Sequence, residues 1–289
     1  MDIYAEYERW LIGDGKSEHT INGYVRDLKL FAKWYEETTG QEMQIGRINQ
    51  IDVAEYRNYL LQRSHANTVN RKIAAVKNFL DFGIYTGRVE HNAAERIKRA
   101  KTVKTAPKSL TSADLRILKQ ALDEEGQPMY SALFALLIYA GLRVSEVVTV
   151  QMDRIHISPR NGWVRALGKG DKFREVGLNS TAREMLQEWY ISRQQAKDNN
   201  PYLFPGARGS GHMTTRAVQK IVNKYATRTR LNLTPHVMRH TFAKHLLDSG
   251  VSLDKVAALL GHSRLETTAI YTKCTQEELN VQTEKIAWN

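Results

Sequence analysis

The sequence predicts a mainly helical protein of two domains, the second of which contains a β-hairpin within a small three-stranded sheet. The length of 289 residues suits about two domains. Apolar residues recur every three or four positions through most of the chain, which indicates helices. A basic segment separates two such regions, so we place the first domain at 1–95, a linker at 96–108 and the second domain at 109–289.

The composition excludes several classes of protein. Hydrophobic residues make up 42% and charged residues 25%, as in soluble globular chains and unlike disordered or collagen-like ones. The longest apolar stretch, about 132–142, is shorter than the ~20 residues that span a bilayer. The acidic segment 1–6 lacks the basic region of a signal peptide. The single cysteine, Cys274, allows neither an internal disulfide nor a zinc site made of cysteines, so we expect a cytoplasmic protein.

The first domain is predicted to be a small bundle of helices. Apolar residues between Ile21 and Tyr35 lie at spacings of three and four and form one stripe. Another amphipathic helix is expected to end near Gly87, a suitable C-cap. The predicted helices lie at about 2–12, around 21–35, at 51–63 and at 67–85.

Two of these helices are predicted to carry an exposed basic face. Residues 1–95 hold 12 Lys and Arg against 14 Asp and Glu, so any binding to a polyanion must depend on local faces. Asn, Arg and Lys on one face of a helix suit the major groove of DNA, although an ordinary solvent-facing helix explains the periodicity equally well. The polar face of the helix at 67–85 comprises Asn67, Asn70, Arg71, Lys77 and Asn78. The predicted DNA contacts in this domain are Arg26, Lys29, Lys33, Arg63, Arg71 and Lys77.

The segment 96–108 has the most concentrated positive charge, with six basic residues and no acidic one. A solvated connector is the ordinary interpretation of such a run. We favour a linker that also crosses phosphates, because the domains on both sides of it offer further reasons to expect a polyanionic partner. The predicted DNA contacts in the linker are Lys98, Arg99 and Lys101.

The second domain is predicted to begin with helices and then to change to strands. Thr111 or Ser112 can cap a helix at 112–123, and an apolar helix at 128–140 ends at Gly141. Segments with strand character follow at Ile155–Ile157, Trp163–Leu167 and Phe173–Leu178, with a hairpin turn at 168–172. From Asn179 the helical period returns and holds almost to the end of the chain.

Two segments of this domain place a cation where it could act on a substrate. Arg143 lies at the edge of the most apolar part of the chain and requires a partner, which Glu146 could supply as an ordinary ion pair. Lys169 lies in the glycine-flanked hairpin turn. Turn lysines are usually only solvent-exposed, so this lysine alone indicates little.

A third segment places His236, Arg239 and His240 on one face of a helix that begins at Pro235. Two histidines four residues apart suggest a zinc protease, but that motif requires Glu at the position of Val237, or at Arg239 in the inverted form. The zinc interpretations therefore fail. Arginine beside histidine is instead a phosphate-binding combination.

A fourth segment holds His262 and, nine residues later, Tyr271, one of 13 tyrosines. The whole set suits cleavage of a phosphodiester: two arginines can stabilise the charge that builds in the transition state, a lysine can protonate the leaving oxygen, and a tyrosine can attack. The chain contains no P-loop, no Gly-x-Ser-x-Gly elbow and no acidic cluster spaced for two metals.

These segments closely resemble the tyrosine recombinase (phage integrase) family. The resemblance is strongest in AGLRVSE, LGKGDKFREV, HVMRHTFAKHLLDSG and LLGHSRLETTAIYTK, which stand in the family's order. It covers nearly the whole chain and implies a SAM-like helical core-binding domain, a basic linker and a catalytic domain. The succession of Arg, Lys, His-x-x-Arg, Gly-His and Tyr makes the match highly specific.

The resemblance implies a role for each matching residue. Tyr271 would be the nucleophile that forms a 3′-phosphotyrosyl bond and releases a 5′-hydroxyl. Arg143 and Arg239 would hold the non-bridging oxygens, assisted by His262. His236 would take part in proton transfer with the tyrosine, and Lys169 would protonate the leaving oxygen. The remaining matches, at Glu146 and His240, would be structural support.

The family also implies the setting of the reaction. It requires no metal, nucleotide or other cofactor, and four protomers act on two double-stranded DNA sites. The segment after Tyr271 would dock onto a neighbouring protomer. The resemblance thus implies a site-specific recombinase that integrates, excises or resolves DNA, in the cytoplasm and nucleoid of a bacterial-type cell.

Three departures from Xer-type relatives favour a mobile-element recombinase over the host system that resolves chromosome dimers. The chain has Asn92-Ala93-Ala94 where those relatives carry Asn-Pro-Ala, Gly177 where they have proline, and Lys273 where they have histidine. The first helix begins almost at Met1, so an additional arm-binding domain is not expected. A catalytically silent DNA-binding protein and a relaxing topoisomerase remain alternatives.

Overall fold

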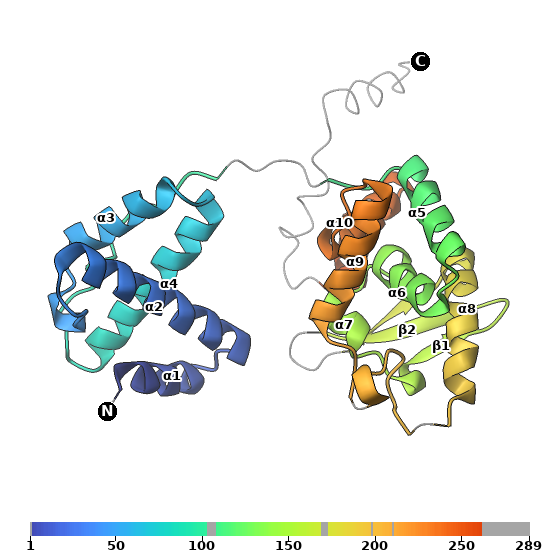
Figure 1. The fold of residues 1–289 in the computed structure, drawn as a ribbon, viewed down its shortest axis with the longest axis horizontal. Helices are drawn as coiled ribbons and strands as arrows, with labels where there is room; N and C mark the ends of the chain where they lie inside the picture. The colour runs from blue at the N-terminus through green and yellow to red at the C-terminus, as the bar shows by residue number, and fades with distance from the viewer. Residues whose placement is uncertain (1, 103–107, 169–172, 198, 210, 262–289) are drawn as a thin grey trace, which may run out of the picture. The chain divides into compact units, whose positions relative to one another are not determined.

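The computed structural model divides into two compact units, Met1–Lys104 and Thr105–Asn289 (Figure 1). It describes residues 2–102, 108–168, 173–197, 199–209 and 211–261. The described residues are mainly helical, with a three-stranded sheet in the second unit, so the predicted fold class is confirmed. Within these residues, no helix is both long enough and apolar enough to cross a membrane.

The first unit is a bundle of α-helices whose starts are fixed by polar caps. The Ser17 side chain accepts a hydrogen bond from the Thr20 amide, and Asn49 forms a capping box with Asp52. Gly40 ends a long helix in the left-handed conformation. The elements are α1 (Ile3–Gly13), α2 (Glu18–Thr39), the 3₁₀ turn η1 (Ile45–Arg47), α3 (Gln50–Leu61) and α4 (Ala66–Tyr85).

Aromatic side chains form much of the core of this unit. Tyr7 on α1 meets Phe79 on α4 edge-on at 5.2 Å between ring centroids, and Phe31 on α2 meets Tyr56 on α3 at 4.9 Å. The buried Tyr7 hydroxyl donates to Asn78 Oδ1 at 2.6 Å. Asn78 was predicted on the exposed polar face of α4; it is half-buried instead, because the tyrosine hydroxyl requires a partner in the core.

The chain that follows α4 folds back onto the same helix. Asn92 Nδ2 donates to the Lys77 carbonyl at 2.9 Å. Asn70 and Ala100 exchange two hydrogen bonds, of 3.0 and 2.7 Å, and the Ala100 methyl group is part of the core. Ala100, within the predicted linker 96–108, is therefore part of the first unit, which extends to Lys104.

The second unit is built around a helix that is apolar on every side. Every residue of this helix, α6, from Ala132 to Leu137 is fully buried, as expected of an apolar helix at the centre of a domain. The preceding helix, predicted to be capped by Thr111 or Ser112, is capped by Thr111, which forms a capping box with Asp114. The helices are α5 (Ser112–Glu125), α6 (Pro128–Tyr139), α7 (Val144–Val148), α8 (Ser180–Gln195), α9 (Thr215–Thr229), α10 (Pro235–Asp248) and α11 (Leu253–Leu260).

The sheet is antiparallel in the order β1 (Ile155–Ile157), β2 (Gly162–Leu167) and β3 (Phe173–Gly177). Ile155 pairs with Val164, and Val164 pairs with Val176. All three are buried, so one apolar row across the sheet fixes its register. The strands agree with the prediction within one residue at each end; most of the predicted turn, 169–172, lies outside the described residues.

The prediction of helix from Asn179 almost to the end of the chain is wrong for the described residues between 196 and 214, that is, all of them except 198 and 210. This segment forms a loop with a 3₁₀ turn, η3 (Ala207–Gly209), and two isolated β-bridges, Gln151 with Tyr202 and Pro205 with His212. Prolines and glycines within the loop interrupt the helical period, since proline lacks the amide that a helix requires.

Candidate active site

The two predicted arginines, Arg143 and Arg239, lie at the start of one helix and in the first half of another. Arg143 is the N-cap residue of the short helix α7. Arg239 lies within α10, which begins at Pro235 as predicted and is capped by the Thr234 side chain. The Gly141 carbonyl, just before α7, accepts a hydrogen bond from Arg239 Nη1 at 2.7 Å, so the two segments are joined directly.

A buried carboxylate, Glu146, brings these arginines together. Glu146 Oε2 accepts from the Arg143 amide at 2.6 Å, and Glu146 Oε1 accepts from Arg143 Nη1 at 2.9 Å. The predicted ion pair of Arg143 and Glu146 is therefore confirmed. Arg239 Nη1 lies 3.7 Å from Glu146 Oε2, so both arginines share the carboxylate.

A third arginine, which the sequence patterns did not single out, binds the same carboxylate. Arg174 on β3 donates from Nη1 and Nη2 to the two oxygens of Glu146 at 2.9 and 2.7 Å. A strand signal could have revealed it: Arg174 lies two positions before the buried Val176 and hence on the same, inward face. A cation on that face requires a partner inside the domain.

The cluster carries an excess of positive charge. Burial would raise the pKa of Glu146, but the hydrogen bonds from Arg174 and from the Arg143 amide outweigh it and lower that pKa. Glu146 is therefore ionised at neutral pH and offsets one of three guanidinium charges. A cluster of this kind favours the binding of an anion with several oxygens, such as a phosphodiester.

The end of α11 closes one side of the cluster. The Leu260 carbonyl accepts hydrogen bonds from Arg239 Nη2 and, at 3.5 Å, from Arg143 Nη1. Gly261 then ends the helix in the left-handed conformation, with φ of +63°. The arginines thus hold the chain immediately before His262, although His262, Lys169 and Tyr271 themselves lie outside the described residues.

The two histidines of α10 differ in their surroundings. His236, in the first turn, is exposed, whereas His240 is half-buried. Burial lowers the pKa of His240, and the nearby His236 and Arg239 lower it further. His240 is therefore neutral at physiological pH and suits a supporting role, while the proton-transfer role of His236 stays a prediction.

The predicted DNA contacts of the first unit fall into two groups. Arg26, Lys29 and Lys33 project from α2 and Lys77 from α4 with exposed side chains, as does Arg63 beyond α3, which lies over the Tyr59 ring. Arg71 instead is tied to the buried Asp27 of α2. Two residues of the polar face predicted on α4 instead hold the bundle together. Asn70 accepts a hydrogen bond from the Ala100 amide, and Asn78 accepts one from the Tyr7 hydroxyl.

A cleft of about 410 Å³ runs between α4 and the chain that folds back onto it. Three predicted DNA contacts from two segments line it, Lys77 from α4 and Lys98 and Arg99 from the chain beyond it. All three are exposed. Their contact with DNA stays a prediction.

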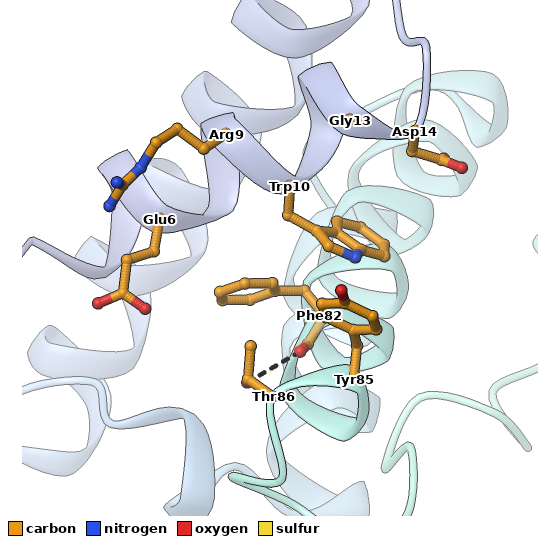
Figure 2. Close-up of a pocket in the computed structure, with 8 residues that line it drawn as sticks. All are labelled: Glu6, Arg9, Trp10, Gly13, Asp14, Phe82, Tyr85 and Thr86. Atoms are coloured by element: carbon orange, nitrogen blue, oxygen red, sulfur yellow. Dashed lines mark hydrogen bonds between the residues drawn. The ribbon is translucent and has the colours of Figure 1, made fainter.

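A second pocket, of about 620 Å³, lies between α1 and the last turns of α4 (Figure 2). Trp10 faces Phe82 and Tyr85 in it, at 5.8 and 6.1 Å between ring centroids. None of the predicted DNA contacts lines this pocket.

Family models match both units. The model of the phage integrase family matches residues 108–278, and the model of the phage integrase N-terminal SAM-like domain matches residues 5–87. The arginine cluster and the catalytic motifs lie in the first of these ranges, and the helical bundle makes up the second.

Curated relatives match over almost their whole length. The chain is 30% identical to tyrosine recombinase XerD of Listeria monocytogenes, covering 96% of each chain. It is 32% identical to tyrosine recombinase XerA of Pyrococcus horikoshii, covering 98% of this chain and 93% of that protein. It is 27% identical to the TnP I resolvase of Bacillus thuringiensis, covering 98% and 99%.

Solved structures share the fold. XerH site-specific recombinase bound to a palindromic difH substrate matches with a TM-score of 0.76 and 22% identity, over 92% of this chain and 79% of that one. The Tn1549 transposon integrase in complex with circular intermediate DNA matches with a TM-score of 0.70 and 19% identity, over 99% and 100%. The family models and the curated relatives define the class of the protein, a DNA strand-breaking and rejoining enzyme. It belongs to the tyrosine recombinase (phage integrase) family.

Proposed function

We propose that this chain is a site-specific recombinase that exchanges strands between two DNA sites through a covalent 3′-phosphotyrosyl intermediate at Tyr271. The observation that carries the proposal is the meeting of Arg143 and Arg239 at the buried Glu146. Two fixed guanidinium groups side by side can hold the two non-bridging oxygens of one phosphodiester.

The proposed reaction proceeds in two exchanges at one phosphorus atom. The Tyr271 hydroxyl gives up its proton, with His236 taking part in that transfer, and its oxygen attacks phosphorus. The bond from phosphorus to the 5′-oxygen breaks, and Lys169 protonates that oxygen. Arg143, Arg239 and His262 stabilise the added charge. A 5′-hydroxyl from the other site then attacks the tyrosyl ester and restores the DNA and the tyrosine, so no hydrolytic energy source is consumed.

The proposed biological role is recombination for a mobile element, by integration, excision or cointegrate resolution. Support comes from the departures at Asn92–Ala94, Gly177 and Lys273, and from the likeness to a protein named a resolvase. The similarity to proteins named XerD and XerA supports the alternative, resolution of chromosome dimers. Transfer of a marked element in cells that carry or lack the gene distinguishes these roles: loss of transfer supports the first, and accumulation of chromosome dimers supports the second.

The proposed assembly is a homotetramer on two double-stranded sites, with the chain after Tyr271 docked on a neighbouring protomer. Removal of residues 274–289 should leave binding of one protomer to one half-site intact and abolish the complex that holds two sites together. Gel mobility and light scattering of the complexes measure both steps.

The enzymatic proposal is tested with nicked suicide duplexes. Sequences that bind the chain are first selected from a random duplex library, and each is then nicked beside the cleavage position. A covalent protein–DNA adduct is expected with the unchanged chain and not with Tyr271→Phe. Binding without an adduct would indicate a catalytically silent protein. Relaxation of supercoils without sequence preference would instead indicate a topoisomerase.

A further inference from the structure

Arg174 is engaged with the protein through each nitrogen of its guanidinium group. Nη1 and Nη2 donate to the two oxygens of Glu146 at 2.9 and 2.7 Å, and Nε donates to the Leu259 carbonyl at 2.8 Å. Its side chain is 12% exposed. Through these contacts Arg174 holds the Glu146 carboxylate and the last turn of α11 in place.

Arg143 shows the opposite pattern. Its side chain is 40% exposed, and Nη1 supplies its hydrogen bonds to Glu146 and to the Leu260 carbonyl. Neither its Nε nor its Nη2 has a hydrogen-bond partner in the part of the chain that the structure describes. Arg143 therefore keeps donors available for an incoming phosphate, and Arg174 fixes the carboxylate against which Arg143 is oriented.

We infer that Arg174 is a positioning residue for DNA cleavage: it holds the Glu146 carboxylate that orients Arg143, and it fastens the last turn of α11 to the same carboxylate. This inference rests on the proposed function. Arg174 acts through Glu146 and the Leu259 carbonyl, which join β3, α7 and α11 at one point.

The geometry requires arginine rather than any cation. The two Nη groups form a fork that matches both carboxylate oxygens, while Nε turns to a different acceptor. A lysine has one ammonium group and cannot make these three contacts together. Gly261 lies close to this guanidinium, since a Cβ at that position would lie 3.0 Å from Arg174 Nη1.

Loss of the fork should also change how Glu146 titrates. The charged groups that face this carboxylate are Arg143 from α7, Arg174 from β3 and Arg239 from α10. Burial raises its pKa, and the Arg174 hydrogen bonds are the largest influence that lowers it. In Arg174→Lys the carboxylate should therefore take up a proton at a higher pH than in the unchanged chain, and Arg143 should lose its anchor as the pH falls.

The test measures cleavage and binding separately on a nicked suicide duplex, with the intact chain in excess over DNA. Arg174→Lys should bind the duplex within about 3-fold of the unchanged chain and cleave it roughly 10- to 100-fold more slowly, as expected when catalytic groups are displaced by about 1 Å. Its cleavage rate should fall further between pH 7.5 and 5.5, relative to the unchanged chain. Glu146→Gln should also cleave slowly, and the double variant should be no slower than Glu146→Gln alone.

A matched control is Arg193→Lys. Arg193 is also a buried arginine of this unit that donates to backbone carbonyls, and the carbonyls that accept from it, those of Asn200 and Tyr202, lie outside the arginine cluster at Glu146. It should lower the thermal midpoint without slowing cleavage. If Arg174→Lys loses DNA binding, the inference is tested with Glu146→Gln, because glutamine keeps the shape of the glutamate side chain. That variant must slow cleavage while its affinity for DNA stays unchanged.

Three outcomes would overturn the inference. They are an unchanged cleavage rate in Arg174→Lys, a double variant slowed by the product of the two single effects, and an equal slowing in Arg193→Lys. Each of these leaves the proposed function intact. Absence of a Tyr271-dependent adduct with the unchanged chain would overturn the proposed function, and the role of Arg174 in it.

Discussion

Arg71 on α4 donates a hydrogen bond to Asp27, a fully buried carboxylate on α2. The Arg71 side chain itself remains 45% exposed. The two helices predicted to contact DNA are thus joined by a residue that is anchored inside the bundle and open to solvent at its surface. The pair fixes the orientation of a predicted DNA-contacting cation before DNA arrives.

Removing Arg71 should cost stability as well as affinity. Arg71→Gln leaves the buried Asp27 carboxylate with one ion pair among the described residues, to Arg26 Nε at 3.9 Å. We expect a loss of about 2 kcal/mol, below the usual cost of breaking a buried pair because Arg71 is half exposed. Asp27→Asn combined with Arg71→Gln should recover part of that loss. Urea unfolding of the unchanged chain, the two single variants and the double variant gives the coupling free energy between Asp27 and Arg71. Strictly additive losses of stability would contradict the prediction.

Gly141 should tolerate alanine far less well than Gly126. Both glycines follow helices with positive φ, +58° and +61°, so a side chain at either position costs about 1 kcal/mol in strain. A Cβ at Gly141 would also lie 2.3 Å from Phe242 Cδ1, whereas nothing lies within 4 Å at Gly126. Gly141→Ala should therefore cost about 3 kcal/mol in all, measured by urea unfolding. Equal losses in the two variants would show that Phe242 moves aside freely.

The basic segment after α4 is predicted to bind phosphates. Replacing Lys98, Arg99 and Lys101 with glutamine should weaken DNA binding and make the salt dependence shallower, by roughly 0.9 in the log–log slope for each phosphate that the variant no longer neutralises. Binding is measured from 50 to 200 mM salt. The matched control replaces Arg9, Lys16 and Arg47, which are exposed on the same unit and outside the predicted DNA-binding residues. The same change of slope in both variants would mean that only total charge matters.

His240 should make the protein less stable in mild acid. Its pKa is lowered in the folded state, chiefly by burial, so the unfolded chain binds the proton more readily. The associated stability is complete above the unfolded pKa of about 6.5 and is lost as the pH falls toward the folded value. The urea midpoint should therefore drop between pH 7.5 and 5.5, and His240→Gln should reduce that drop. If the urea midpoint of His240→Gln depended on pH as that of the unchanged chain does, a group other than His240 would be responsible.

Periodicity predicted the helices and strands because their buried faces repeat regularly, as in the stripe from Ile21 to Tyr35. Periodicity failed where a polar side chain forms hydrogen bonds with backbone groups far away in the sequence. The spacing along α4 predicts that Asn70 faces solvent, but its side-chain amide forms hydrogen bonds with the backbone of Ala100, thirty residues further along the chain. No local pattern reveals a partner so far along the chain. Arg174 could have been predicted from strand alternation, but its bond to Glu146 depends on how β3 and α7 pack.

The Leu260 carbonyl gives the arginines an internal ligand. A carbonyl oxygen resembles a phosphate oxygen in its lone pairs, and it lies at the negative end of the α11 dipole. Neither arginine therefore faces an empty, desolvated space before DNA binds. In the proposed reaction, a phosphodiester oxygen would replace this carbonyl at one nitrogen of each arginine, while Nε and Nη2 of Arg143 offer additional donors. The helix end that holds the arginines leads directly to His262, so the proposed exchange would be felt at that residue first.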